Sequence, residues 1–372
     1  MSNIPAYVRS QLPSHNLSVN EFLTVSLLPY ASGTARFMRV KKYISEQPPN
    51  ISHIDNVGEL LSPPADIVTE LQLCLKKGSV TSVLCPHLPL TAGTRYPLWV
   101  IELWTDLLVV RNIQENWKKA VNQLEEKLRT APTTLLIQQA ANALAHLPWT
   151  GNLLGYHNTI DLSQLWVYFT QEWLSDNHLL VMQELLTEDI SRECHRHAFI
   201  EDTHFMSLLT TAYRNQQSYA TERSFAWIRD RGNQLASGHK TCLTTIVNQH
   251  NVHWVALILD FHEKKIQYGD STGRPMEHGL QEVVEWWVFH HTGLRFAHES
   301  LVIGLQHDSY SCGMLAWDAL HYRLGGPSVT RMDPSQPSNE RLKVFLRLVK
   351  HHKIKQVSVS SCLTCYCGLI PV

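Results

Sequence analysis

The 372-residue sequence lacks long apolar runs, an excess of charge of either sign, internal repeats and low-complexity segments. No stretch approaches the roughly 18 consecutive apolar residues of a membrane-spanning helix. Lys and Arg number 32 against 33 Asp and Glu, and a formal net charge of -1 suggests binding neither to nucleic acid nor to a membrane surface. The N-terminal segment also lacks the charged-then-apolar pattern of a signal peptide. We therefore expect a protein of the nucleus or cytoplasm without nucleic-acid or membrane partners.

The cysteines of the sequence also lack the spacing of a disulfide framework or of a closed zinc site. Eight cysteines are scattered through a long chain without a secretion signal, so free thiols are expected rather than a disulfide framework. Two clusters contain metal-ligating residue types, but neither has the spacing of a closed tetrahedral zinc site. The clusters are Cys194 and His195 with His197 and His204, and Cys362 with Cys365 and Cys367. We therefore expect neither a metal nor another cofactor.

Composition and periodicity divide the chain into three parts. Residues 1–150 form an accessory region of unknown role, which is partly helical. Apolar residues at spacings of three and four predict one helix from Pro97 to about Arg129, and a second helix ends near Pro148. Residues 151–345 have mixed α and β patterns. Residues 346–372 end in a Ser- and Cys-rich stretch, which predicts a disordered tail.

The middle part predicts helices that flank a small set of strands. A helix should follow Ser175 or Asp176, either of which is a suitable N-cap, and run to about Leu186. Further helices are expected over 203–214, 218–236, 277–291 and 314–324. Apolar runs predict strands over 242–247, 252–260, 266–269 and 300–305. This order predicts an α+β fold.

The second and third strands predict a hairpin that joins two polar residues. Its turn centres near residues 262–264, so that paired positions sum to about 525, and the side chains of His253 and Asp270 lie close enough to hydrogen-bond. An Asp in this position fixes the tautomer and orientation of a His and stabilises its protonated form.

The fourth strand and the last helix of this part frame a cysteine. Cys312 falls at a helix start, where backbone N–H groups stabilise a thiolate, as a nearby His cation also does. Gln306 lies six residues earlier, where its amide can donate to a developing oxyanion together with the N–H of Cys312. Gly313 leaves room for a substrate backbone. These residue types indicate nucleophilic catalysis by a thiol.

Each of these residues alone is most often structural, and only their order and spacing together indicate a site. The motifs resemble the catalytic core of the ubiquitin-like-protein proteases, the SUMO-processing cysteine peptidases. The resemblance rests on His253-Trp254, on Asp270-Ser271 and on Gln306 followed by Asp308, Ser311, Cys312 and Gly313. Trp173-Leu174-Ser175-Asp176 is similar to the Trp-Leu-x-Asp segment that opens the family's catalytic domain. The similarity covers roughly 155–330.

The resemblance implies a papain-like cysteine proteinase fold, with a central, mainly antiparallel sheet flanked by helices, and it makes residues 151–345 the catalytic domain. It implies that Cys312 attacks a carbonyl and forms a thioester. His253 would act as general base and then as general acid, Asp270 would orient it, and Gln306 would help to hold the oxyanion.

The resemblance also implies residues on the substrate side. Trp173 and Trp254 would flank a narrow tunnel that admits only a Gly-Gly tail, because two indole faces leave no space for a Cβ. Asp176 and Gly313 would bind substrate beside them. The partners would be a SUMO-like modifier and its protein conjugates, although the sequence does not identify which ubiquitin-like protein is cleaved.

Two alternatives stay open at this point. The first is a protease of the same fold that cuts a viral or transposon-type polyprotein. The adenovirus protease shares the His, acid, Gln and Cys order, and the long N-terminal region is unassigned. The second is a non-catalytic module that binds a ubiquitin-like protein, against which the complete set of four polar residues argues.

Overall fold

The computed structural model describes residues 4–29, 39–52, 54, 60–85, 93–131, 134–190, 197–326 and 329–366, with side chains described up to residue 357. The chain divides into two compact units. One consists of Met1–Glu126 with Ala141–Gly151, and the other of Lys127–Ala140 with Asn152–Val372. Every site residue expected from the sequence belongs to the second unit. No helix of the described part is long and apolar enough to cross a membrane.

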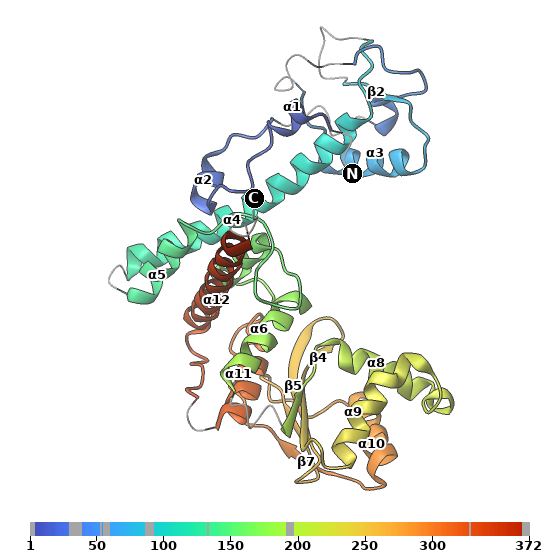
Figure 1. Ribbon diagram of the computed structural model, residues 1–372, viewed down its shortest axis with the longest axis vertical. Coiled ribbons are helices and arrows are strands. Elements are labelled where there is room, and N and C mark those ends of the chain that lie inside the picture. The colour runs from blue at the N-terminus through green and yellow to red at the C-terminus, as the bar shows by residue number, and fades with distance from the viewer. Residues whose placement is uncertain are drawn as a thin grey trace, which may run out of the picture. The chain divides into compact units, whose positions relative to one another are not determined.

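The first unit is mainly helical and packs around the beginning of its longest helix, α4 (Trp99–Thr130) (Figure 1). This helix confirms the one predicted from Pro97 to about Arg129. The second predicted helix is α5 (Leu135–Leu144). The remaining elements are α1 (Ala6–Arg9), α2 (Val19–Thr24), η2 (Val40–Lys42), β1 (Ile44–Ser45), α3 (Ala65–Lys76) and β2 (Ser82–Val83).

The second unit is built around a five-stranded sheet in the order β3-β4-β5-β6-β7. The strands are β3 (Ala198–Ile200), β4 (Cys242–Gln249), β5 (His253–Asp260), β6 (Lys265–Gly269) and β7 (Ala297–Ser300). The three central strands pair antiparallel, whereas β3 and β7 pair parallel at the two edges. The helical elements are η5 (Leu162–Phe169), α6 (Asp176–Asp189), α8 (His204–Arg214), η6 (Gln216–Ser218), η7 (Arg223–Phe225), α9 (Ala226–Ala236), α10 (His278–Thr292), α11 (Cys312–Gly325) and α12 (Pro337–Tyr366).

Strand β5 is apolar along nearly its whole length because helices cover both faces of the sheet (Figure 1). Val255, Leu257 and Leu259 point to one face and join a core with α8, α9 and α10. The side chain of Trp254 points to the other face, where α11 packs with α6. This alternation follows from the two-residue period of a strand.

The register of the predicted hairpin is confirmed. Ala256 pairs with Gly269 and Leu257 pairs with Tyr268, so that paired positions sum to 525 (256 + 269). The preceding β4–β5 turn is equally tight, and His250 and Asn251 both adopt positive φ there, at 55° and 60°. The two turns fix where His253 and Asp270 lie along their strands.

The fourth predicted strand, over 300–305, differs from the structure. The edge strand β7 covers Ala297–Ser300, and the chain after it keeps only isolated backbone bonds to its neighbour, from Leu301 N to Tyr268 O and from Gln306 N to Ser271 O. Gly304 approaches Pro334 and Leu315 so closely that a Cβ there would lie 2.8 Å from Pro334. The apolar run 301–303 therefore belongs to a connection and not to a ladder, and Val302 within it is exposed.

Two helical segments also differ from expectation. The helix predicted over 218–236 is two 3₁₀ turns followed by α9, because the chain bends around the fully buried Tyr219, whose hydroxyl accepts a hydrogen bond from Trp287. The tail predicted from residue 346 begins inside α12, which runs across this boundary. Leu348, Val349 and His352 are buried, and His352 Nδ1 accepts a hydrogen bond from Leu154 N at 2.9 Å. These three residues are therefore ordered by burial, although the composition of the segment predicted a disordered tail.

The central position of β5 leads to a stability prediction. Leu257→Ala removes a fully buried side chain of the main core, and we expect it to lower the free energy of unfolding by about 2–5 kcal/mol. The matched control is Leu294→Ala, since Leu294 is 45% exposed, and its effect should stay below about 0.5 kcal/mol. Urea unfolding of both variants measures the difference, and equal effects would contradict the assigned core.

Candidate active site

Cys312 is the first residue of α11, and its thiol is free and almost fully buried, with 1% exposure. The N–H groups of the first helical turn have no partners within the helix and give this end a partial positive charge. Asp308 shapes the loop that leads into the helix. One oxygen of its carboxylate accepts hydrogen bonds from the N–H groups of Tyr310 and Ser311, and the other accepts one from the Ser311 hydroxyl.

His253 and Asp270 meet across the β5–β6 hairpin, as predicted. His253 Nε2 lies 2.7 Å from Asp270 Oδ1, and the Asp270 side chain is only 2% exposed. The same oxygen accepts two further hydrogen bonds, from the backbone N–H and the hydroxyl of Thr272. With Nε2 directed at the carboxylate, the ring nitrogen that remains for Cys312 is Nδ1.

The charges of these three residues support one another. Burial raises the pKa of the Cys312 thiol, but hydrogen bonds from His253, from the backbone N–H of Trp254 and from the Trp173 indole outweigh it, so that the pKa lies below its ordinary value. The hydrogen bond with Cys312 and the contact with Asp270 raise the pKa of His253 against the effect of burial. The pKa of Asp270 is lowered, since bonds from Thr272 and His253 outweigh its burial. The arrangement favours a thiolate beside an imidazolium.

Trp173 and Trp254, which are 81 residues apart in the sequence, stack on each other at the site. Their ring centroids are 5.2 Å apart with an interplanar angle of 23°. Trp254 is fully buried, and its Nε1 donates to Leu174 O at 2.9 Å. Trp173 is only half-buried, and its Nε1 donates to Cys312 Sγ at 3.1 Å. The rings therefore leave no open passage between them in this structure, and one of them covers the sulfur.

Gln306 lies beside the loop that contains Asp270 and Ser271. Its Oε1 accepts a hydrogen bond from the Ser271 hydroxyl at 2.7 Å, and its Nε2 donates to Asp308 O at 3.0 Å. In the described part of the chain, the hydrogen bonds of its amide go to these two residues and not to Cys312. Since a primary amide carries two N–H donors, one remains after the bond to Asp308.

The two remaining predicted substrate-side residues lie in different surroundings. Gly313 is buried, and a Cβ there would lie 3.2 Å from Trp254 and 3.3 Å from Leu179. Close packing of α11 on β5 and α6 thus accounts for this glycine, which is a different reason from the substrate contact predicted for it. Asp176 is the first residue of α6 and lines a cavity of about 710 Å³.

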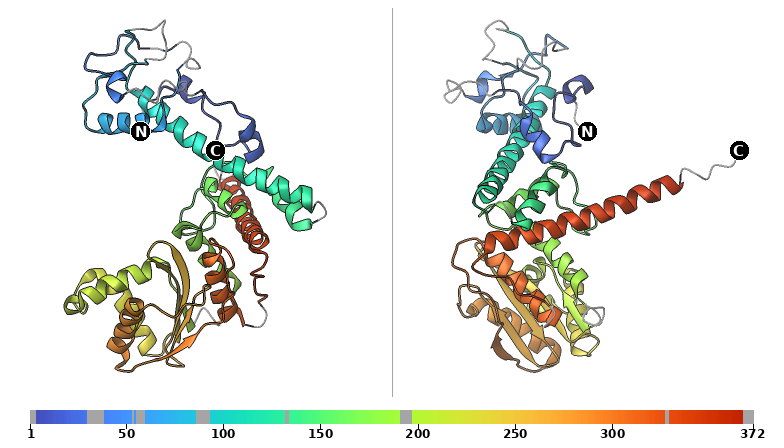
Figure 2. Two further views of the ribbon diagram at one scale, coloured as in Figure 1. Left: turned by 180° about the vertical axis from the view of Figure 1, so that it is seen from behind. Right: turned by 90° about the vertical axis from the view of Figure 1, so that its left-hand side faces the viewer.

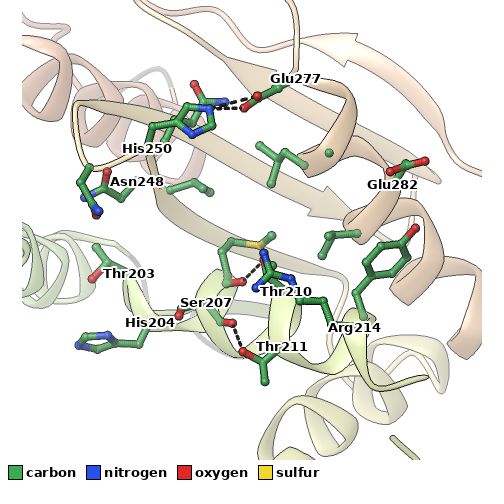
Figure 3. A pocket seen from close by; sticks show the side chains of 18 of the residues that line it. Thr203, His204, Ser207, Thr210, Thr211, Arg214, Asn248, His250, Glu277 and Glu282 are labelled. Atoms are coloured by element: carbon green, nitrogen blue, oxygen red, sulfur yellow. Dashed lines mark hydrogen bonds and ion pairs between the residues drawn. The ribbon is translucent and has the colours of Figure 1, made fainter. Parts of the chain in front are cut away.

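This cavity lies between α8, the β4–β5 turn and the start of α10 (Figure 3). His204, Ser207 and Thr211 line it from α8, and Figure 3 shows Asn248 and His250 across from them. His250 Nε2 lies 2.9 Å from Glu277 Oε2 at the rim. Polar and apolar side chains both line this cavity.

Sequence reasoning missed several residues that hold the site together. His178 fixes the turn before α6, because Ser175 Oγ lies 2.7 Å from its Nδ1 while its Nε2 lies 3.0 Å from Gln164 O. Burial lowers the pKa of His178 to about 4, which keeps the ring neutral. Thr272 was also missed, and its backbone N–H and hydroxyl both donate to Asp270. Arg341 left no signal, because it lies on α12 at the edge of the predicted domain.

Among the described residues, no group of three or more His, Cys, Asp or Glu side chains could hold a metal ion. Cys194, His195 and Cys367 lie outside the described residues, and the side chains of Cys362 and Cys365 do as well.

Comparison with known families agrees with this site. Residues 172–289 match the model of the Ulp1 protease family, C-terminal catalytic domain. The match includes Trp173, His253 and Asp270 and ends before Gln306 and Cys312. Over these residues, the match confirms the family predicted from the motifs. The α+β fold with its mainly antiparallel sheet and helical N-terminal region is confirmed as well.

Similar solved structures include proteases from yeast, fungi and bacteria, whereas no curated protein matches. The yeast Ulp1 C-terminal protease domain in complex with Smt3 is 17% identical with a TM-score of 0.45, covering 57% of this chain and 93% of that chain. The Chaetomium thermophilum Ulp1-like SUMO protease catalytic domain is 14% identical with a TM-score of 0.39, covering 49% of this chain and 74% of that chain. The Xanthomonas campestris effector protein XopD bound to ubiquitin is 22% identical with a TM-score of 0.33, covering 47% of this chain and 92% of that chain.

The contacts of Cys312 lead to a prediction about its reactivity. The midpoint of the pH dependence of its alkylation by iodoacetamide should lie below about 8.5, the ordinary thiol value. His253→Ala should move this midpoint upward, because it removes a donor and a cation and leaves burial, which raises the thiol pKa. Mass spectrometry of the Cys312 peptide across pH measures both values.

The control for this prediction is His250→Ala, since His250 lies on the same hairpin but its side chain is 70% exposed at the turn. This variant should keep the wild-type midpoint. A wild-type midpoint at or above about 8.5 would show that no thiolate–imidazolium pair forms.

Proposed function

We propose that this protein is a cysteine peptidase that cleaves after the C-terminal Gly-Gly of a SUMO-like modifier, both in precursors and in protein conjugates. The observation that carries the proposal is the 2.7 Å contact between His253 and Asp270 beside a buried thiol at a helix start. The Ulp1 family match supports the same chemistry. We place this activity in the nucleus or cytoplasm, where such modifiers and their conjugates occur.

The proposed reaction begins with the Cys312 thiolate, which attacks the carbonyl carbon of the last glycine. As the tetrahedral intermediate collapses, His253 gives its proton to the leaving amine, and a thioester remains on Cys312. His253 then takes a proton from water, which attacks the thioester and releases the modifier with a free carboxylate. Asp270 holds the ring in one orientation and stabilises its charged form through both halves of the reaction.

The negative charge on the carbonyl oxygen needs donors at the start of α11. The N–H of Cys312 has no acceptor within its helix, and Gln306 has one amide hydrogen beyond its bond to Asp308. We assign both as oxyanion donors. The bond from Ser271 holds the amide oxygen of Gln306, and the amide nitrogen donates to Asp308 in the loop before α11.

Selection of glycine would come from the two indoles. Trp254 is fixed by its burial and by its bond to Leu174, so that Trp173 is the ring that has to move when a tail enters. The tail would replace the stacking contact between the rings, and a residue with a side chain would not fit between them. Asp176 lines the cavity beside α8, where we place the folded body of the modifier.

The proposed nucleophile is tested by Cys312→Ala. This variant should fold and should retain less than about a thousandth of wild-type turnover of a fluorogenic SUMO C-terminal substrate, because a covalent nucleophile is lost. Cys74→Ala, a half-buried thiol of the first unit, is the control and should keep full activity. Substantial turnover by Cys312→Ala would remove the assignment.

Glycine selection is tested by changing the residue before the scissile bond from Gly to Ala. The loss in kcat/KM should exceed the roughly 10–200-fold expected for one methyl group in a forgiving pocket. Trp173→Ala should reduce this ratio while lowering overall activity. SUMO and ubiquitin substrates should be compared, since the yeast protein was solved with Smt3 and XopD with ubiquitin. Equal cleavage of both tails would leave a cysteine peptidase of another specificity.

A further inference from the structure

Arg341 is a fully buried cation that the proposed reaction does not use. It lies in the first turns of α12, the long C-terminal helix drawn in red in Figure 2, and its exposed fraction is 0%. Residues buried for packing alone are usually apolar, and a buried charge is costly unless it is paired or fully hydrogen-bonded. Burial lowers the pKa of Arg341 to about 10, so the guanidinium stays charged at neutral pH.

The partners of this guanidinium are backbone carbonyls from two separate segments. Nη1 donates to Val167 O at 3.0 Å and to Thr170 O at 2.7 Å, whereas Nη2 donates to Tyr310 O at 3.1 Å. The charged group also lies over the ring of Tyr310, 4.9 Å from its centroid. Hydrogen bonds from a charged donor are the stronger kind, and the planar fork of an Arg holds its acceptors in a fixed geometry.

Both segments lead directly into the proposed site. Thr170 ends η5 and precedes Trp173 by three residues, and Tyr310 precedes Cys312 by two. The 3.1 Å bond from Trp173 to Cys312 Sγ therefore connects two segments of the chain. The guanidinium of Arg341 is hydrogen-bonded to both of these segments. The charge of Cys312 is also among the influences that raise the pKa of Arg341, and such an interaction stabilises the thiolate in return.

We propose that Arg341 is a positioning residue of the active site: its guanidinium fixes the loop of Trp173 against the loop of Cys312. The inference rests on the proposed function, because it concerns the same thiol. It makes the beginning of α12 a part of the catalytic machinery. The fork sets the distance between the indole N–H and Sγ and the direction of the Cys312 N–H, while its charge favours the thiolate.

Two variants separate geometry from charge. Arg341→Met keeps much of the buried volume but removes the charge and all three bonds. We expect kcat to fall about 10–100-fold with less than about a threefold change in KM, and the alkylation midpoint of Cys312 to rise by about 0.5–1 pH unit. Arg341→Lys keeps the charge but cannot reproduce the fork. It should lose kcat as well, while its alkylation midpoint stays close to wild type.

The matched control is Arg347→Met on the same helix. Arg347 pairs with Asp189 and packs on the ring of Trp317, 5.4 Å from its centroid, and it makes none of the three bonds to the two loops. This variant loses an ion pair by the same substitution, so it reports what a merely structural change in α12 does. It should keep the wild-type kcat and alkylation midpoint, even where urea unfolding shows a loss of stability.

Kinetics on the SUMO substrate, alkylation across pH and urea unfolding are measured for all variants of the full chain. Folded Arg341 variants with wild-type kcat and midpoint would overturn the inference, as would equal effects of Arg341→Met and Arg347→Met. Should Arg341→Met fail to fold, the loss of kcat in Arg341→Lys decides. Failure of the proposed function is distinguishable, because the wild-type protein itself would then show no SUMO turnover and no lowered alkylation midpoint.

Discussion

The pairing of β5 with β6 is the constraint on which the site depends. Only one register brings His253 at the start of one strand against Asp270 just beyond the end of the other, and a shift by one residue would turn His253 to the opposite face. That register is held by burial on both faces of the sheet, since Leu257 and Trp254 contact different cores. The stability of the sheet and the chemistry of the site therefore rest on the same contacts.

Three remote segments converge on the thiol that this hairpin faces. The loop before α6 contributes Trp173, β5 contributes His253 and the N–H of Trp254, and α11 contributes Cys312 at its positive end. Each contributes a donor or a positive charge, and together they outweigh the burial that would otherwise keep the thiol neutral. The stacking of Trp173 on Trp254 places the Trp173 indole against the same sulfur, and Cys312 is almost fully buried.

Local sequence predicted the parts of the site that depend on spacing. The hairpin register followed from the turn between 262 and 264, and the helix start at Cys312 followed from the pattern after residue 311. Local sequence did not predict the position of the edge strand β7 or the helical structure of the residues after 346. The run 301–303 is apolar enough for a strand, but the approach of Gly304 to Pro334 takes it out of the ladder, and a contact between residues thirty apart has no local signature.

Arg341 shows the same limit more clearly. Its acceptors are carbonyl groups, which every residue has, so no pattern of side chains distinguishes it from a surface Arg before the fold is known. The closure of the two indoles was likewise hidden, because their meeting was predicted but not their stacking. Sequence spacing predicts contacts between residues that are joined by one turn or one hairpin. Contacts between more distant elements become known only from the packed structure.

The most direct test of the central claim is covalent labelling by a SUMO protein that ends in a vinyl sulfone after its last glycine, with a ubiquitin probe in parallel. Intact mass and peptide mapping identify the modified residue. The account predicts a single adduct on Cys312 with at least one of the two probes. An adduct on another cysteine, or no adduct with either probe on the folded protein, would contradict it.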